Sequence, residues 1–561
     1  MTDFTLDPYA ARSCPVKTFN EFDPNLALPE VDHALGELFS GGREHRDRVL
    51  TAVRESHPGL PDEQGETPAE RLQRTLAMMS DGAPVVLAAR LTPDAEGHRR
   101  GGTDLLVRGD DAPSGGPGYW PVRVKNYRVL EKQTGCKDLE FAPATHPTRR
   151  AVLTDLRFRT SRQAVLLELA HVWRMLETHG FASATPLGGI IGTDQLPTRG
   201  NQPGIVWVGL DTRMLRTFSR TAATGFRLRS ALERYDHEHG FRVHVAEQAM
   251  TRAPGEEPAV RPIRVRECEW CPWWEVCRPR MDDDDLSLRI SKTPLDVREL
   301  QTLMGLGIQT VTDLAAADVD AILPAYLPLT THRDHSEQRL RTAARRARML
   351  AAGVELERVT ADPIGIPRAE VEVDLDIETA EGDVTYLWGM LVTDRRSGRQ
   401  HFEHFSLFTE LTPADEIDLC AQFSRRLLEL AAAHPGLRVF HYSDYETVHI
   451  RRLAERSRQP DILAATKLVA DHFVDLFRPV RDNFVGVDGL GLKVVASRGA
   501  GFRWRDDAPG GLNSQIWFDS AVHAPSEEER AAARTRVLEY NEDDVRATWA
   551  VREWLTDTSG G

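Results

Sequence analysis

Three of the chain's six cysteines lie close together in the segment ECEWCPWWEVC, residues 267–277. Their spacing is C-x2-C-x5-C, so Cys268 and Cys271 belong to one tight turn and Cys277 lies a short helical step beyond it. This spacing is typical of ligands for a metal ion or cluster, and such groups normally take four protein ligands. No fourth cysteine lies nearby. Cys14, in RSCPVKTF, is the candidate because the two ends of a domain can meet in the fold.

Acidic residues with catalytic spacing occur in the last third of the chain. In VEVDLDIET, Asp376 and Glu378 stand two residues apart, so both would lie on one face of a strand. In EYNEDDVRATWAV, Tyr540 and Asp544 stand four apart and would share one face of a helix. The strand LRVF would run into His441 and then into a helix that carries Glu446. Each pattern also occurs without a metal, but buried neighbouring carboxylates repel unless a cation neutralises them. The sequence therefore predicts a Mg²⁺ or Mn²⁺ site at Asp376, Glu378 and Asp544.

The elements that hold these residues must belong to several domains, because 561 residues exceed what one hydrophobic core supports. We expect an α/β multidomain protein with domains at residues 1–280, 286–350 and 368–556, and with the acidic run MDDDD as a solvated joint. The net charge of −15 restricts any nucleic-acid path to a local groove. No apolar run approaches the roughly 20 residues of a membrane helix, and MTDFTLDPYAARSC is not a signal peptide. We therefore expect a cytoplasmic protein without a membrane partner.

The layout of Cys14 with Cys268, Cys271 and Cys277 resembles the iron-sulfur subclass of RecB and AddB type nucleases. The resemblance implies that residues 1–280 form a restriction-endonuclease-like PD-(D/E)xK domain whose two ends are joined by a structural [4Fe-4S] cluster on these thiolates. Zinc on the same four thiolates is the main alternative, and a group of buried thiols beside tryptophans is another.

The same resemblance implies a nuclease centre with Asp104 and Lys125 as catalytic residues and with His45 and Asp104 as metal ligands. Two residues depart from the family's pattern and weaken the case for an active centre. Arg123 stands two residues before Lys125, where the family has Asp or Glu, and a guanidinium cannot ligate a metal. Glu168 stands where the family's later motif has Gln. We therefore expect a degenerate centre in a domain that still binds nucleic acid.

The middle of the chain reads as helical from residue 286 to 350. RELQTLMGLGIQTVTDLAA predicts a helix, a hairpin with Gly305 and Gly307, and a second helix. This resembles a helix-hairpin-helix element, in which glycines let backbone N–H groups approach a phosphate of nucleic acid. A plain hairpin between two packed helices would give a similar pattern.

The order of the acidic motifs resembles the DEDD exonucleases of the ribonuclease-H-like fold, in the branch with Y-x3-D. The resemblance implies two metal ions on the three carboxylates and a water oriented by Tyr540. Glu446 takes the place of the family's middle aspartate, as in the YprB-type subfamily. Lys493, in GLGLKVVASRGAGFRW, is a candidate phosphate contact.

The whole chain resembles a bacterial family of RecB-like nucleases fused to a YprB-type ribonuclease-H-like domain. The resemblance implies a metal-dependent nuclease acting in DNA repair, with 3′-to-5′ exonuclease catalysis in the C-terminal domain and DNA binding by the N-terminal domain. An RNA-directed exonuclease is one alternative, because ribonuclease-H-like sites barely distinguish the sugars. A catalytically inactive nucleic-acid-binding or adaptor protein is the other.

Overall fold

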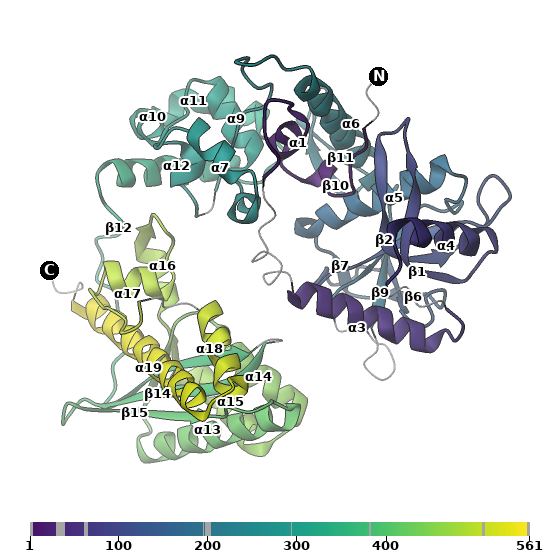
Figure 1. The fold of residues 1–561 in the computed structure, drawn as a ribbon. Helices are drawn as coiled ribbons and strands as arrows, with labels where there is room; N and C mark the ends of the chain where they lie inside the picture. Colours follow the sequence, from purple (N-terminus) through teal and green to yellow (C-terminus); the bar gives the residue numbers. More distant parts are fainter. Residues whose placement is uncertain are drawn as a thin grey trace. The chain divides into compact units, whose positions relative to one another are not determined.

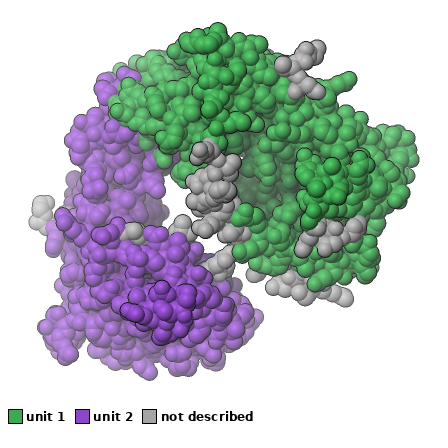
Figure 2. All heavy atoms as spheres, in the orientation of Figure 1, with its two compact units in different colours: residues 1–288, 295–310, 318–340 green, residues 289–294, 311–317, 341–561 purple. Residues whose placement is uncertain are grey.

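The computed structural model describes residues 4–29, 40–60, 65–194, 196, 203–292, 294–380, 383–507 and 511–557. The chain forms two compact units, coloured separately in Figure 2. Unit 1 comprises residues 1–288, 295–310 and 318–340, and unit 2 comprises residues 289–294, 311–317 and 341–561. The helical segment 286–350 contributes to both units, and its status as a separate domain stays a prediction.

Unit 1 is built on a seven-stranded mixed sheet with the order β1-β2-β3-β8-β9-β5-β6 (Figure 1). Only β3 and β8 pair in parallel in this sheet; the other neighbours are antiparallel. The strands are β1 Val85–Asp94, β2 Arg99–Arg108, β3 Tyr119–Val124, β5 Leu139–Pro143, β6 Ala151–Leu153, β8 Leu187–Ile191 and β9 Gly204–Gly209. Two small ribbons pair β4 Leu130–Lys132 with β7 Leu156–Phe158, and β10 Leu215–Phe218 with β11 Phe226–Arg229.

Helix α5 (Ala164–Thr178) packs on this sheet and is buried over most of its length, which explains its nearly continuous apolar sequence. Glu168 and His171 are the polar residues among its buried positions. The remaining helices of this part of unit 1 are α1 Pro15–Phe22, α3 Ser40–Ser56, α4 Pro68–Ser80, α6 Ala231–Met250 and α7 Trp274–Cys277.

The middle segment is helical, as predicted. Its helices are α8 Leu286–Arg289, α9 Val297–Gly305, α10 Val311–Ala316, α11 Val319–Tyr326 and α12 Ser336–Ala351. The predicted helix, hairpin and helix correspond to α9, a turn and α10. Gly307 in that turn has φ +82°, a left-handed conformation that favours glycine.

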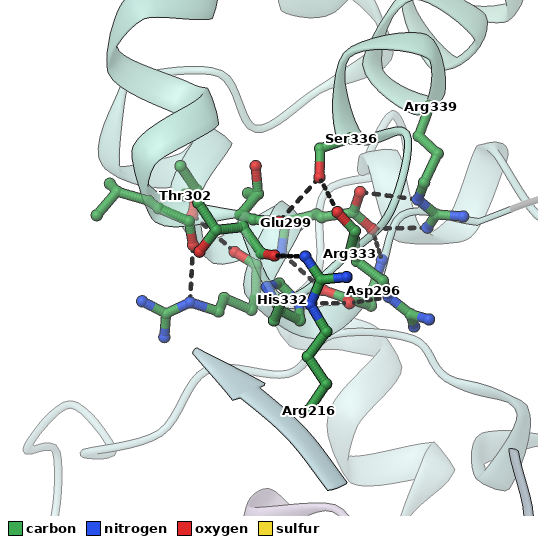
Figure 3. A network of polar contacts seen from close by, with 12 residues as sticks. Arg216, Asp296, Glu299, Thr302, His332, Arg333, Ser336 and Arg339 are labelled. Carbon is green, nitrogen blue, oxygen red and sulfur yellow. Dashed lines mark hydrogen bonds and ion pairs between the residues drawn. The ribbon is translucent and has the colours of Figure 1, made fainter. Parts of the chain in front are cut away.

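A network of polar side chains fixes the start of α9 (Figure 3). Asp296 caps the helix, and its carboxylate accepts hydrogen bonds from His332 (2.8 Å) and Arg333 (2.6 Å). The fully buried Glu299 accepts two bonds from Arg339, at 2.9 and 2.6 Å. Because the buried Glu299 and the partly exposed Asp296 each have a cationic partner, the network stabilises this helical segment without a metal ion.

Unit 2 is built on a five-stranded sheet with the order β15-β14-β13-β16-β17. β13 pairs antiparallel with β14 and parallel with β16. The strands are β13 Val371–Ala380, β14 Val384–Asp394, β15 Arg399–Ser406, β16 Arg438–His441 and β17 Phe473–Asp475, with β12 Leu356–Arg358 and β18 Phe484–Gly486 as a separate pair. The helices are α13 Pro413–Ala433, α14 Tyr445–Ser457, α15 Pro460–His472, α16 Phe477–Asn483, α17 Leu492–Arg498, α18 Gly511–His523 and α19 Glu527–Asp557.

The alternating sequence of β13 divides its side chains between two environments. Val373, Leu375 and Ile377 pack in an apolar cluster with residues of α13, α14 and α15. The intervening acidic residues point to the opposite face, which α19 covers (Figure 1). The strand that the sequence predicted is thus confirmed, and α19 meets its acidic face together with α18. Among the described residues, no helix is both long and apolar enough to span a membrane.

Candidate active site

The acidic face of β13 and one face of α19 bring three carboxylates together. Asp376, Glu378 and Asp544 each offer one oxygen atom, and these atoms lie within 4.8 Å of one another. Glu378 and Asp544 are buried and Asp376 is partly buried. In the described part of the chain, this is the one group of three or more His, Cys, Asp or Glu side chains with such spacing.

Neighbouring donors fix the orientation of all three carboxylates. Ser514 Oγ donates to Glu378 Oε2 at 2.7 Å, and Trp504 Nε1 donates to Asp544 Oδ1 at 2.7 Å. The side-chain amide of Asn541 donates to Asp376 Oδ2 at 2.8 Å. Each bond involves one carboxylate oxygen, so the second oxygen can serve another ligand.

These three donors were not among the residues predicted from the sequence. Asn541 precedes Asp544 by three positions on a helix, so helical periodicity alone could have identified it. Trp504 and Ser514 carry no comparable signal, since they reach the site from a loop and from α18.

A glycine makes room for Asn541 against the sheet. Gly389 on β14 lies opposite Asp376 in the strand register. A Cβ atom at Gly389 would come within 1.7 Å of Asn541 Oδ1, so any larger residue would displace the amide. Gly389 is therefore a packing requirement of the site.

Tyr540 and Lys493 stand beside Asp544. Lys493 Nζ on α17 donates a hydrogen bond to the Tyr540 hydroxyl and lies 3.9 Å from Asp544 Oδ2. Burial, followed by the charge of Asp544, raises the pKa of Tyr540 far above its usual value, so the phenol stays protonated. The predicted phosphate contact thus lies at the site, and its role toward phosphate stays a prediction.

Glu446 lies on a helix, as predicted; it is buried in the first turn of α14. Burial is the main reason why the pKa of Asp376 is raised, and the charge of Glu446 adds to it after those of Asp544 and Glu378, so Glu446 acts electrostatically on Asp376. Its Oε2 atom has no hydrogen-bond partner among the described residues, and His441 Nδ1 is 3.6 Å away. A buried carboxylate oxygen without a donor is costly unless a cation occupies the space beside it.

The electrostatics of the group call for cations. Burial, and after it the charge of Asp544, raises the pKa of Glu378 to about 8. Burial also raises the pKa of Asp376 well above its usual value, and the charges of Asp544 and Glu378 raise it further. The carboxylates are therefore favoured in their charged form only when positive charge is supplied. All-oxygen ligands of this kind suit Mg²⁺ or Mn²⁺.

Asp374 lies on the same face of β13 but does not join this group. Arg552 on α19 donates to both of its oxygens, from Nε at 3.1 Å and from Nη2 at 2.8 Å. Both side chains are fully buried. Asp374 is thus neutralised by the protein itself, which separates it from Asp376.

Two of the residues predicted for an N-terminal nuclease centre, Asp104 and Lys125, lie on or directly after neighbouring strands. Asp104 on β2 accepts hydrogen bonds from Arg46 Nε (2.6 Å) and from the backbone N–H of Val124 (2.9 Å). Lys125 directly follows β3 and donates to both oxygens of Glu168, at 3.0 and 2.8 Å. Both residues are therefore engaged by other side chains.

The predicted histidine ligand belongs to the same region. His45 lies on α3, one residue before Arg46, and its Nε2 atom has no hydrogen-bond partner within the described ranges. Among the described residues, neither His45 nor Asp104 has two further potential ligands whose atoms all lie within 4.8 Å of one another, as Asp376, Glu378 and Asp544 do. A metal at His45 and Asp104 stays a prediction.

The four predicted thiol ligands line one small cavity. Its walls include Cys14, Cys268, Cys271 and Cys277, together with Trp273 and other residues. Burial raises the pKa of each of these four thiols, to about 11 for Cys14. Uncharged thiols are thus favoured unless a metal or cluster binds.

The hairpin glycines are open to their surroundings. A Cβ atom at Gly305 or at Gly307 would meet no other atom within 4 Å. This space is compatible with the approach of a phosphate, and nucleic-acid binding by the hairpin stays a prediction.

Comparison with known proteins bears on the C-terminal part of the chain. Residues 373–556 match the family model of the RNase H superfamily, and this range contains every residue of the acidic group. No curated protein and no solved structure gives a significant match. The C-terminal part is therefore a ribonuclease-H-like domain within a mixed α/β multidomain chain. Such a domain indicates a nuclease-type function that uses Mg²⁺ or Mn²⁺ at its acidic residues.

Proposed function

We propose that the protein is a 3′-to-5′ exonuclease acting on DNA, with hydrolysis at the Asp376 group of the C-terminal domain. The observation that carries the proposal is the convergence of Asp376, Glu378 and Asp544 oxygens within 4.8 Å in a largely buried setting. Mg²⁺ or Mn²⁺ bound there would supply Lewis-acid activation of water and neutralise charge on the leaving oxygen.

The protein's own groups have separable tasks in this reaction. The carboxylates bind the cations, and the donors Asn541, Ser514 and Trp504 hold them in one orientation. Tyr540 keeps its proton, so its hydroxyl can orient the attacking water. Lys493 positions that hydroxyl and adds positive charge where a phosphate would lie.

Digestion of end-labelled substrates tests this proposal. The parent protein and Asp376→Ala would be incubated with single-stranded DNA, duplex DNA and RNA, labelled at either end, in Mg²⁺, Mn²⁺ or EDTA. We expect stepwise shortening of DNA from the 3′ end by the parent with metal, and none by the variant. Faster digestion of RNA would favour the RNA-directed alternative. Binding without cleavage of any substrate would favour the adaptor alternative.

For the N-terminal unit we propose a RecB-like PD-(D/E)xK domain with a degenerate centre. Asp104 lies on β2 and Lys125 directly follows the adjacent strand β3, but Arg46 pairs with Asp104 and Glu168 pairs with Lys125. At saturating substrate, Asp104→Ala and Lys125→Ala should therefore leave total nuclease activity within about twofold of the parent. A loss comparable to that of Asp376→Ala would show that this centre is active.

We further propose that Cys14, Cys268, Cys271 and Cys277 hold a [4Fe-4S] cluster that joins the two ends of this domain. They line one cavity, yet no three of them have sulfur atoms within 4.8 Å in the described structure. Their shared cavity is what supports a bound inorganic group, and the family resemblance is what favours an iron-sulfur cluster over zinc.

Metal analysis of anaerobically purified protein tests the cluster. We expect iron, acid-labile sulfide and a broad absorbance near ~400 nm. Cys14→Ala should remove all three and lower the melting temperature, whereas Cys420→Ala, at a thiol on α13 in unit 2, should retain the iron. Stoichiometric zinc without iron in the parent would establish the zinc alternative.

A further inference from the structure

Four charged side chains meet where α5, β3 and the N-terminal segment come together in unit 1. They are Arg12, Arg123, Lys125 and Glu168, here called the Glu168 cluster. Glu168 is buried, and all three cations approach its carboxylate. Lys125 Nζ lies at 2.8 Å, Arg12 Nε at 3.1 Å and Arg123 Nε at 3.5 Å from its oxygens.

The Glu168 cluster has more positive than negative charge. One carboxylate serves three cations, and no other carboxylate lies within ion-pair distance of them in the described part of the chain. Burial and the neighbouring arginines lower the pKa of Lys125, opposed by Glu168. Gathering these cations is thus unfavourable for the protein alone, and a second anion would relieve the repulsion.

Arg123 has a long ion pair with Glu168, and its Nε atom makes no hydrogen bond to any described residue. It is only 8% exposed, and Glu168 is beyond hydrogen-bonding distance of this atom. A buried guanidinium donor left unpaired costs free energy that an added oxygen acceptor would restore. Guanidinium groups are well suited to phosphate oxygens.

An exposed aromatic ring completes the arrangement. Tyr9 is 41% exposed, and its ring centroid lies 4.8 Å from Arg12 Cζ and 5.7 Å from Lys125 Nζ. The side chain of Arg12 is 38% exposed, so solvent reaches the cluster from this side. Sites that bind single-stranded nucleic acid combine cations along the phosphate backbone with an aromatic ring on which a base can stack.

We propose that the Glu168 cluster is a metal-independent binding site for a phosphodiester of single-stranded nucleic acid, with Tyr9 as the surface on which a base stacks. Arg123 supplies positive charge at the position where a nuclease centre would hold a metal-binding carboxylate, so the site binds without cutting. The position given to Arg123 rests on the proposed degenerate centre of the N-terminal unit, whereas the inference does not depend on hydrolysis by the C-terminal domain.

Equilibrium binding of a labelled single-stranded DNA oligonucleotide in EDTA tests the site without turnover. In the full-length protein, Arg12→Gln and Lys125→Met should each weaken binding several-fold and reduce the slope of log Kd against log salt by about one. Glu168→Gln should instead tighten binding, because it removes the competing anion. Arg157→Gln, which removes an exposed partner of Glu131 in the same unit, is the matched control and should bind like the parent.

Weaker binding by the Arg12 and Lys125 variants and tighter binding by the Glu168 variant together distinguish a binding site from a structural cluster. A cluster that only stabilises the fold predicts lower melting temperatures for the Arg12, Lys125 and Glu168 variants with an unchanged salt slope, and that result would overturn the proposal. Arg12 is the most exposed of the cations, so its variant is the one expected to remain folded. Full displacement of the oligonucleotide by inorganic phosphate at equal phosphate concentration would also overturn it, since the site would then take free phosphate and not a nucleic-acid chain.

Discussion

Arg552 and Asp374 form a fully buried bidentate ion pair two residues along β13 from Asp376. Helix α19 thus places a cation, Arg552, beside Asp374, and it places a further carboxylate, Asp544, beside Asp376. The two neighbouring aspartates should therefore respond in opposite ways to removal.

Asp374→Ala should lower the free energy of unfolding by about 1–3 kcal/mol, because the buried Arg552 loses two hydrogen bonds and keeps only Glu372 and Glu553 as partners. Asp376→Ala should abolish metal-dependent hydrolysis while raising or barely altering the melting temperature without metal, because it relieves repulsion. Thermal unfolding in EDTA, beside the nuclease assay, measures both. Equal destabilisation by the two variants would contradict the difference in their roles.

Tyr540→Phe should slow hydrolysis by about 10²- to 10⁴-fold while metal binding is retained, because the hydroxyl that orients the water is lost. Lys493→Met should act in the same direction by a smaller factor, since Lys493 holds that hydroxyl. Single-turnover rates and Mn²⁺ titration separate the two effects. Lys467→Met, at an exposed lysine of α15, is the matched control and should be neutral. Loss of Mn²⁺ binding by Tyr540→Phe would point to a structural role.

The pH dependence of stability without metal follows from Glu378. Its pKa is raised from 4.5 to about 8 in the folded protein, so the folded state takes up a proton that the unfolded state releases at these pH values. The free energy of unfolding should therefore increase as the pH falls from about 8 toward about 4.5. Mg²⁺ must displace this proton, so its stabilising effect should be larger at the upper end of the range.

Melting curves in EDTA and in Mg²⁺ across this range check that expectation. Glu378→Gln should flatten the dependence in EDTA, because the titrating group is gone. An unchanged slope in that variant would assign the proton uptake to other groups.

Gly389→Ala should destabilise the C-terminal domain by about 1–3 kcal/mol and reduce hydrolysis, because the added methyl group displaces Asn541 from Asp376. Gly436→Ala, where a Cβ atom meets nothing within 4 Å, is the control and should do neither. Melting temperature and nuclease rate are the two readouts. Full activity in Gly389→Ala would mean that the amide is dispensable.

The sequence by itself determined the elements and the residue types of the acidic site. Alternation in VEVDLDIET predicted a strand with its acids on one face, and β13 confirms it. The four-residue spacing of Tyr540 and Asp544 predicted a shared helical face, and α19 confirms the helix. These features are local, because the periods of 2 and 3.6 residues fix which side chains point the same way.

Only the tertiary structure decided which of those acids form a site. Asp374 and Asp376 are the same residue type on the same face of β13. Their roles differ because α19, more than 150 residues away in sequence, places Arg552 beside Asp374 and Asp544 beside Asp376. Likewise, the sequence showed that Arg123 replaces a metal-binding carboxylate. That Arg123 and Arg12 both lie beside Glu168 depended on long-range packing. Periodicity determines on which face of an element a residue lies. The partner that this residue contacts depends on which distant element packs its apolar surface against that face.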